Sequence, residues 1–214
     1  MPTYKTLPKS RKTEALPLYR PIDDLVYSAW KKKEILMPFL VVGFVALLAF
    51  VGFQSYSNRY DSKASDLFNQ GNFESVIREY PRSGSSRIAR MKLGKQAFEA
   101  KDFDKAIAWY GPVAQDADAP AILRIAGTQN LALAYLKKGD AAKSVELLER
   151  ASKDRMNRTA DYTQLLLARA EEVKGDVEAA KALYQSLSEG ASDVGIKNEA
   201  KERMTWIEKG SHSK

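Results

Sequence analysis

The 214-residue sequence predicts an all-α protein, in which a single transmembrane helix at the N-terminal end is followed by an α-solenoid of stacked helix pairs. Two observations carry this prediction. Residues 35–53 form a run of 19 residues without a charged side chain, and a short pattern of turn, cap and apolar residues recurs four times after it. No segment shows the alternation of apolar and polar side chains that is typical of a strand.

The apolar run is long enough to cross a bilayer. At about 1.5 Å of rise per residue it covers roughly 28 Å, close to the thickness of the hydrocarbon core. It also lacks the polar face of a soluble amphipathic helix. We therefore expect a retained transmembrane helix over residues 35–56. A cleaved signal peptide, with Ser55 and Ser57 near the cleavage site, is the alternative, but its basic region would exceed 30 residues and its apolar region would be unusually long.

Positive charge is concentrated before the apolar run. Residues 1–34 contain eight lysines and arginines, whereas the twenty residues after Phe53 contain two. Cytoplasmic flanks of transmembrane helices are rich in these residues. The N-terminus is therefore expected in the cytoplasm, and the C-terminal part across the membrane.

The segment before the apolar run is expected to have two parts. Residues 1–21 contain four prolines and no periodicity, which predicts a flexible cytoplasmic tail. Residues 22–34 show apolar residues at helical spacing, which predicts an amphipathic juxtamembrane helix. Its end would meet the membrane interface, with one aromatic and three basic side chains at headgroup depth: Trp30, Lys31, Lys32 and Lys33.

Composition excludes several classes of chemistry. The net charge of +7 divides into +4 on residues 1–34 and +3 on the rest, so the larger part has no nucleic-acid footprint. The chain has no cysteine and one histidine, His212, which lies in a predicted disordered tail at residues 210–214. Thiol catalysis, Ser-His-Asp triads, Cys-ligated metal sites and zinc sites built from several histidines are therefore excluded. We expect no enzyme activity, no cofactor, no metal and no small-molecule substrate.

Four segments after the apolar run resemble one another. They begin at Gly71, Lys101, Gly139 and Gly175, with steps of 30, 38 and 36 residues, which bracket the period of about 34 of a tetratricopeptide repeat. A glycine at this position suits a left-handed turn between two helices, and the turn at Lys101 is expected to close differently. Each turn is followed by a predicted N-cap, namely Asn72, Asp102, Asp140 and Asp176. A small residue that allows close helix contact comes next, at Val76, Ala106, Ser144 and Ala180. A large residue follows one helical face later, at Tyr80, Tyr110, Leu148 and Tyr184.

These repeats define the domain at residues 57–209. The sequence predicts a tetratricopeptide-like α-solenoid of about three repeats with a partial repeat. The third repeat is degenerate, because Glu171 stands where an aromatic residue is usual. A capping helix is expected over residues 197–209, with Ala200, Met204 and Ile207 on one face. A plain helical bundle is the structural alternative.

The arrangement of the whole chain resembles a known family. The phrases Val76-Ile-Arg-Glu-Tyr-Pro81, Ala89-Arg-Met-Lys-Leu-Gly94 and Glu199-Ala-Lys-Glu-Arg-Met-Thr-Trp-Ile-Glu208, behind a single N-terminal span, are similar to those of the ancillary Sec-translocon subunit family (YfgM-like tetratricopeptide proteins). The resemblance implies a single-pass protein of the bacterial inner membrane. Its periplasmic repeats would work beside the secretion channel, with chaperone-like partners.

A solenoid of helix pairs leaves a concave groove lined by the first helix of each pair. The repeat register places a mixture of apolar, aromatic and charged side chains there, which suits a bound helix or extended peptide. The predicted protein-binding residues are Ile88, Met91, Lys95, Phe98, Glu99, Gln129, Leu133, Leu136, Tyr162, Leu165 and Arg169. Each of them could instead pack against a neighbouring helix.

Three functions are compatible with these features. The first is a membrane-anchored scaffold or adaptor with a chaperone-like role, which binds other membrane or periplasmic proteins through the groove. The second is a structural accessory subunit of an inner-membrane complex, held by its transmembrane helix. An enzyme is the third, and the sequence shows no phosphate loop, metal-ligand spacing or nucleophile–base pair to support it.

Overall fold

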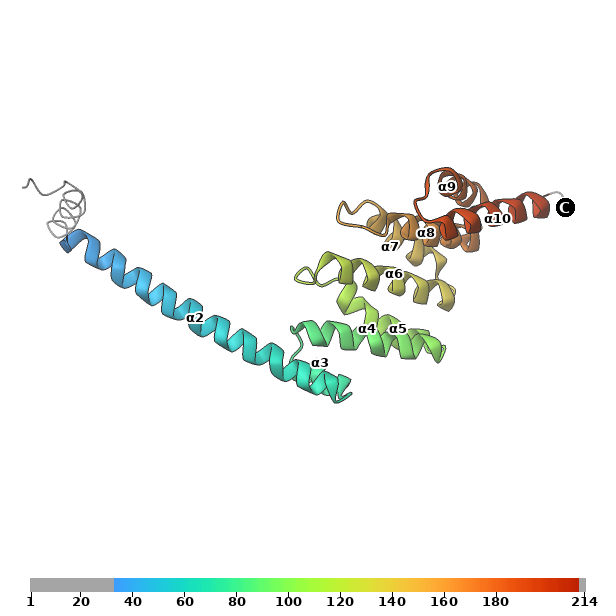
Figure 1. The fold of residues 1–214 in the computed structure, drawn as a ribbon. Helices are drawn as coiled ribbons and strands as arrows, with labels where there is room; N and C mark the ends of the chain where they lie inside the picture. Colours follow the sequence, from blue (N-terminus) through green and yellow to red (C-terminus); the bar gives the residue numbers. More distant parts are fainter. Residues whose placement is uncertain (1–32, 212–214) are drawn as a thin grey trace, which may run out of the picture. The chain divides into compact units, whose positions relative to one another are not determined.

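The computed structural model describes residues 33–211, with side chains described for residues 37–209. Within this range every regular element is an α-helix, and the helices are labelled α2 to α10 (Figure 1). The described part divides into two compact units, with the boundary between Ser57 and Asn58. Several predicted features lie outside the described residues. They are the tail at residues 1–21, most of the juxtamembrane helix, residues 212–214 of the C-terminal tail, and the side chains of Trp30, Lys31, Lys32 and Lys33.

The apolar run lies in α2 (Lys33–Asn69). The stretch from Met37 is long and apolar enough to cross a membrane, and none of its most apolar window is buried by other parts of the protein. Phe39 and Phe53 are 73% and 71% exposed. Exposing a side chain of this size to water costs about 1.5–3 kcal/mol, so an apolar environment would stabilise the apolar part of α2.

The last turns of α2 belong to the second unit, where they act as the first helix of a partial pair. Ala64 is fully buried there. The Tyr60 ring packs edge-on against Tyr80 with 5.0 Å between centroids, and Phe68 packs against Phe73 at 5.1 Å. The partner helix is the short α3 (Phe73–Glu79).

Three full pairs and a single terminal helix follow (Figure 1). The first pair is α4 (Gly84–Glu99) with α5 (Phe103–Ala114), and the second is α6 (Ala121–Lys138) with α7 (Ala141–Ser152). The third pair is α8 (Ala160–Lys174) with α9 (Val177–Gly190), and α10 (Val194–Ser211) ends the stack. Each helix packs mainly against its neighbours along the chain, and α6 also contacts α4 and α8. The predicted α-solenoid of three repeats with a partial repeat and a capping helix is confirmed.

The four turns within the pairs share one backbone conformation. Gly71, Gly139 and Gly175 have φ angles of 80°, 96° and 97°, as their left-handed role predicts. Lys101 has φ 60°, in the same left-handed region. The expectation of a different turn at Lys101 is wrong, because the backbone bonds that close the preceding helix, from Lys101 N–H to Phe98 and from the Asp102 N–H to Ala97, impose the same geometry.

All four predicted residues occupy N-cap positions, and three of them cap the helix with a side-chain hydrogen bond. The Asp102, Asp140 and Asp176 side chains accept hydrogen bonds from the backbone N–H three residues later, at 3.1, 3.0 and 3.1 Å. Asn72 occupies the N-cap position of α3, as predicted, but its side chain makes no cap hydrogen bond. Its amide instead donates to Gln70 at 3.4 Å.

The alternation of small and large residues produces the packing. All four predicted small residues are fully buried, and Tyr110, Leu148 and Tyr184 fill the spaces between helices. Gly94 shows how close this approach is, because a Cβ there would lie 2.6 Å from the Tyr110 ring. Tyr80 is only half-buried, because it ends α3 and packs against Tyr60.

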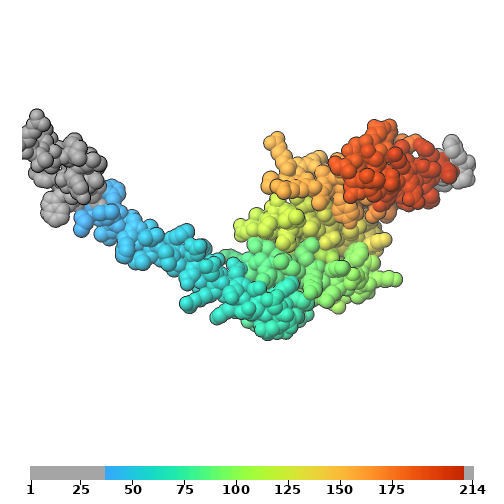
Figure 2. Space-filling view, viewed as in Figure 1, coloured from blue at the N-terminus to red at the C-terminus, as the bar shows by residue number. Residues whose placement is uncertain are grey.

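The terminal helix α10 covers the end of the stack. Ala200 is fully buried and Ile207 is 8% exposed, and both pack in one cluster with Leu165 and Leu187 of the third pair. The predicted cap is therefore confirmed. Figure 2 shows the pairs packed side by side into a continuous body from green to red.

Candidate functional site: a groove on the first two pairs

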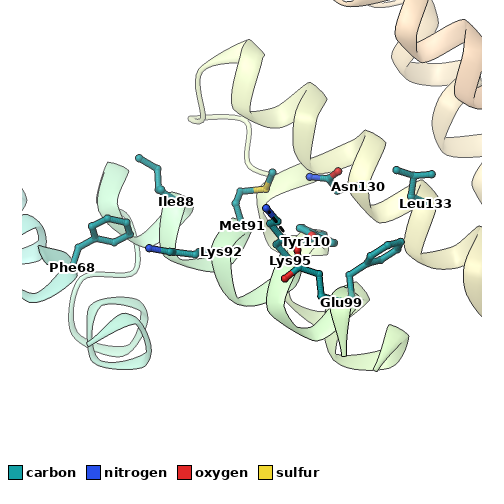
Figure 3. Close-up of a pocket in the computed structure, with 10 residues that line it drawn as sticks. Phe68, Ile88, Met91, Lys92, Lys95, Glu99, Tyr110, Asn130 and Leu133 are labelled. Carbon is teal, nitrogen blue, oxygen red and sulfur yellow. Dashed lines mark ion pairs between the residues drawn. The ribbon is translucent and has the colours of Figure 1, made fainter. Parts of the chain in front are cut away.

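A cavity of about 680 Å³ opens on the repeat unit, between the end of α2 and helices α4, α5 and α6. Figure 3 shows its lining side chains converging from these four helices. We call it the α4 groove, and it is lined by Phe68, Ile88, Met91, Lys92, Lys95, Phe98, Glu99, Tyr110, Asn130 and Leu133.

Six of the predicted binding residues lie together in this groove. Five of them come from one face of α4, because side chains three, four and seven residues apart point the same way on a helix. Leu133 of α6 contributes from the opposite wall. The six are Ile88, Met91, Lys95, Phe98, Glu99 and Leu133.

The sequence interpretation did not include four of the lining residues. Phe68 belongs to α2, whose apolar run obscures the fact that its last turns also form the first helix of the partial pair. Lys92 and Asn130 lie 38 residues apart, which is the repeat step from α4 to α6. They therefore hold equivalent positions in two repeats, and the repeat register could have indicated both as lining residues. Tyr110 was predicted as a packing residue, and its ring both fills the space beside Gly94 and forms part of the floor.

The floor of the α4 groove is aromatic and apolar. Phe98 packs edge-on against Phe103 with 5.5 Å between ring centroids. Burial, together with the nearby carboxylate of Glu99, raises the pKa of Tyr110 to about 12. The Tyr110 hydroxyl therefore stays neutral at physiological pH.

The rim of the groove carries charge. The Lys92 ammonium lies 4.8 Å from the centroid of Phe73 and 5.7 Å from that of Phe68, within the range of cation–π attraction. The Lys95 ammonium lies 3.7 Å from the Glu99 carboxylate, and both side chains are largely exposed (Figure 3). An exposed pair of this kind is worth at most about 1 kcal/mol, so a ligand can displace it at little cost.

In the second pair, the structure places Gln129 away from the groove. The Gln129 side chain is 6% exposed, and its amide donates to the hydroxyls of Thr159 and Thr163 at 2.9 and 2.8 Å. Gln129 therefore holds the second and third pairs together. Leu136 is half-buried against the central core and does not line the groove either.

The third pair does not extend the groove, because α10 covers the third pair at the equivalent place. Leu165 is 2% exposed and packs under α10. The Arg169 guanidinium donates to the Glu199 carboxylate of α10 at 2.9 Å. Tyr162 remains exposed but lies apart from the cavity. The side chains of Gln129, Leu165 and Arg169, predicted for the groove, are thus occupied by contacts with neighbouring helices of the stack.

A second ion pair strengthens the contact between α8 and α10. The Glu172 carboxylate binds the guanidinium of Arg203 and accepts a hydrogen bond from the Tyr184 hydroxyl at 3.0 Å. Burial and then this carboxylate raise the pKa of Tyr184 to about 12. The terminal helix is therefore fixed by both apolar and charged contacts.

Comparison with known proteins agrees with this architecture. No curated protein matches the chain. The chain does match the tetratricopeptide repeat-like domain over residues 28–158, which includes the apolar run, the partial pair and the first two full pairs. The match ends before the third pair, whose sequence is degenerate. Tetratricopeptide-like repeats form an interaction fold without catalytic machinery of their own. Since the matched residues make up more than half of its length, the chain belongs to the tetratricopeptide repeat-like domain family.

Proposed function

We propose that the protein is a membrane-anchored scaffold that binds another protein in the α4 groove. The observation that carries this proposal is the groove itself, an open cavity of about 680 Å³ with an aromatic floor and a charged rim on a repeat fold that mediates protein contacts. Aromatic residues and methionine are enriched at the centres of protein interfaces, and the groove has both.

The shape and chemistry of the groove favour a short helical or extended segment. Met91, Phe98 and Leu133 offer an apolar floor for one or two inserted side chains. At the rim, Lys92 and Lys95 supply donors for carboxylates or backbone carbonyls of the bound segment.

We further propose that α2 crosses the bacterial inner membrane with the N-terminus in the cytoplasm and the repeats in the periplasm. The excess of lysine and arginine before the apolar run supports this orientation. The resemblance to ancillary Sec-translocon subunits supports a place beside the secretion channel. On this proposal, the partners are emerging envelope proteins or their chaperones.

Site-specific photocrosslinking in the full-length protein tests the groove. A photoreactive residue at Lys95, on the rim, is expected to capture a discrete protein partner in native membranes. The same photoreactive residue at Ser186, which is exposed on α9, is the control and should not capture the partner. A second change, Met91→Glu, places a charge on the floor and should abolish capture from Lys95. Equal adducts from both positions, or none from Lys95, would contradict the proposal.

A structural subunit held by its transmembrane helix is the second candidate. The exposure of the whole apolar part of α2 favours this candidate. Gly43 and Gly52 also have open space around them, since a Cβ at either position would meet nothing within 4 Å. Small residues on a transmembrane helix allow another helix to approach closely. In this case the partner would bind in the membrane, and the groove variant would not release it.

A further inference from the structure

The connection between α7 and α8 has an unusual composition for a surface loop. Residues 153–159 place Met156 between the two arginines Arg155 and Arg158. The Met156 side chain is 61% exposed, and both arginines are exposed as well. Neither guanidinium forms an ion pair within the part of the chain that the structure describes.

Hydrogen bonds hold this loop in a defined shape. The Asp154 carboxylate accepts from the Met156 backbone N–H at 2.9 Å and from Arg124 of α6 at 3.3 Å. The Asn157 amide donates to the carbonyl of Ala151 at 2.9 Å and to the Thr163 hydroxyl at 2.8 Å. The Asn157 side chain thus points into the repeat unit, while the Met156 side chain points outward.

A second exposed apolar side chain lies beside the loop. Ile122, in the first turn of α6, is 70% exposed. Ile122, Met156 and Arg158 line one cavity of about 310 Å³, with Ile125 in its wall. The fold therefore brings two apolar tips together with unpaired guanidinium groups, and Figure 2 shows the orange loop projecting from the body of the repeat unit.

This surface lies on the edge of the repeat unit where the chain enters it. Connections between pairs lie on one edge of the stack, and the turns within pairs lie on the other (Figure 1). The Tyr60 hydroxyl accepts a hydrogen bond from the backbone N–H of Arg82, in the connection between α3 and α4, at 3.4 Å. The start of the unit is therefore at the edge of the connections, and along the chain it directly follows the apolar run.

We propose that Ile122, Arg155, Met156 and Arg158 form a lipid-contact surface for bilayers that carry anionic phospholipid. Guanidinium groups bind phosphate oxygens in a bidentate manner, and basic side chains are attracted to the surface of an anionic membrane. The two apolar tips enter the interfacial region beside them. Four side chains are too few for a stable protein interface, which buries about 1,200–2,000 Å². The proposal rests on the anchoring of α2 in a membrane.

A single-cysteine probe tests the contact in the full-length protein. The sequence contains no cysteine, so Met156→Cys can be labelled alone with an environment-sensitive fluorophore. Val173→Cys, at the end of α8 on the other edge, is the matched control, because Val173 is 62% exposed. After reconstitution into vesicles of phosphatidylcholine with phosphatidylglycerol, the emission from position 156 should shift to shorter wavelength and be quenched by lipid-borne quenchers. The emission from position 173 should not.

The charge dependence gives the second readout. The double change Arg155→Gln with Arg158→Gln, in the Met156→Cys protein, should remove the difference between vesicles with and without phosphatidylglycerol. Equal, water-like emission from positions 156 and 173 in vesicles that carry the protein would overturn the lipid contact and leave the anchor intact. A shift that follows the protein-to-lipid ratio and ignores phosphatidylglycerol would overturn it in favour of contact between copies. Failure of the protein to float with vesicles would overturn the anchor and the lipid contact together.

Discussion

At the scale of single residues, Lys101 adopts the backbone conformation that glycine adopts at the three equivalent turns. A left-handed conformation costs a residue with a Cβ about 1–2 kcal/mol of stability. Glycine avoids this cost but lowers the free energy of unfolding by about 0.4–1 kcal/mol, because its unfolded chain has more conformational freedom. Lys101→Gly should therefore raise the free energy of unfolding by about 0.5–1 kcal/mol, measured by urea denaturation of the detergent-solubilised protein. Gly139→Ala, the reverse change at an equivalent turn, should lower it. A loss of stability in Lys101→Gly would contradict the strain at that turn.

The ion pair between Arg87 and Asp116 gives a prediction about pH. The Arg87 guanidinium donates to the Asp116 carboxylate at 2.7 Å, and this hydrogen bond holds the pKa of Asp116 below its usual 3.8. Because the pKa is lower in the folded protein, the contribution is complete above the unfolded pKa and is lost as the pH falls through the folded value. Asp116→Asn should therefore lower the free energy of unfolding by about 1 kcal/mol at neutral pH.

The difference between the native protein and Asp116→Asn should shrink as the pH falls below 3.8, when followed by urea denaturation across a pH series. Asp118→Asn is the control, since this neighbouring carboxylate is exposed and forms no ion pair among the described residues. A difference that persists unchanged in acid would show that the carboxylate charge is not what stabilises the connection.

At the scale of elements, α10 supplies the apolar cover that the third pair lacks. Ile207 packs into the cluster with Leu165 and Leu187, so Ile207→Ala should cost about 2–3 kcal/mol of unfolding free energy. Lys201→Ala, on the exposed face of the same helix, should stay within about 0.5 kcal/mol. Thermal unfolding followed by circular dichroism measures both, and equal effects of the two changes would argue against the capping role.

The helix pairs were predictable from the sequence because their signals are local. Left-handed glycines, aspartate caps and the alternation of small and large residues depend on a few neighbouring positions, and each recurs at the repeat step. The conformation of Lys101 is not predictable from its residue type, because the hydrogen bonds of the whole turn fix it. The α4 half of the groove was also predictable, because it lies on one face of one helix.

The rest of the site depends on contacts between distant residues. Arg169 meets Glu199 across 30 positions, and Gln129 meets Thr163 across 34. Their residue types suit a groove as well as a packed interface, so the repeat register cannot separate the two cases. Only the position of the next element along the stack shows that these side chains are occupied.

At the scale of the whole molecule, exchange of the apolar run separates the two candidate functions. Replacing residues 35–56 with an unrelated transmembrane sequence keeps the α4 groove and removes any specific helix contact in the membrane. A scaffold should retain its partners in affinity purification from solubilised membranes, because it needs only the tether. The Met91→Glu protein, with its native apolar run, is the matched comparison. Loss of partners only after the exchange would favour the structural subunit.

The contacts between helices have a consequence for biosynthesis. Since each helix packs mainly on the one made just before it, a growing polypeptide can settle pair by pair as it is produced, without waiting for its far end. The third pair is the exception, because one of its faces is buried only after α10 has been synthesised. Until the final eighteen-residue helix arrives, the surface around Leu165 and Leu187 stays open to solvent, so unfinished chains are the ones most exposed to aggregation and proteolysis.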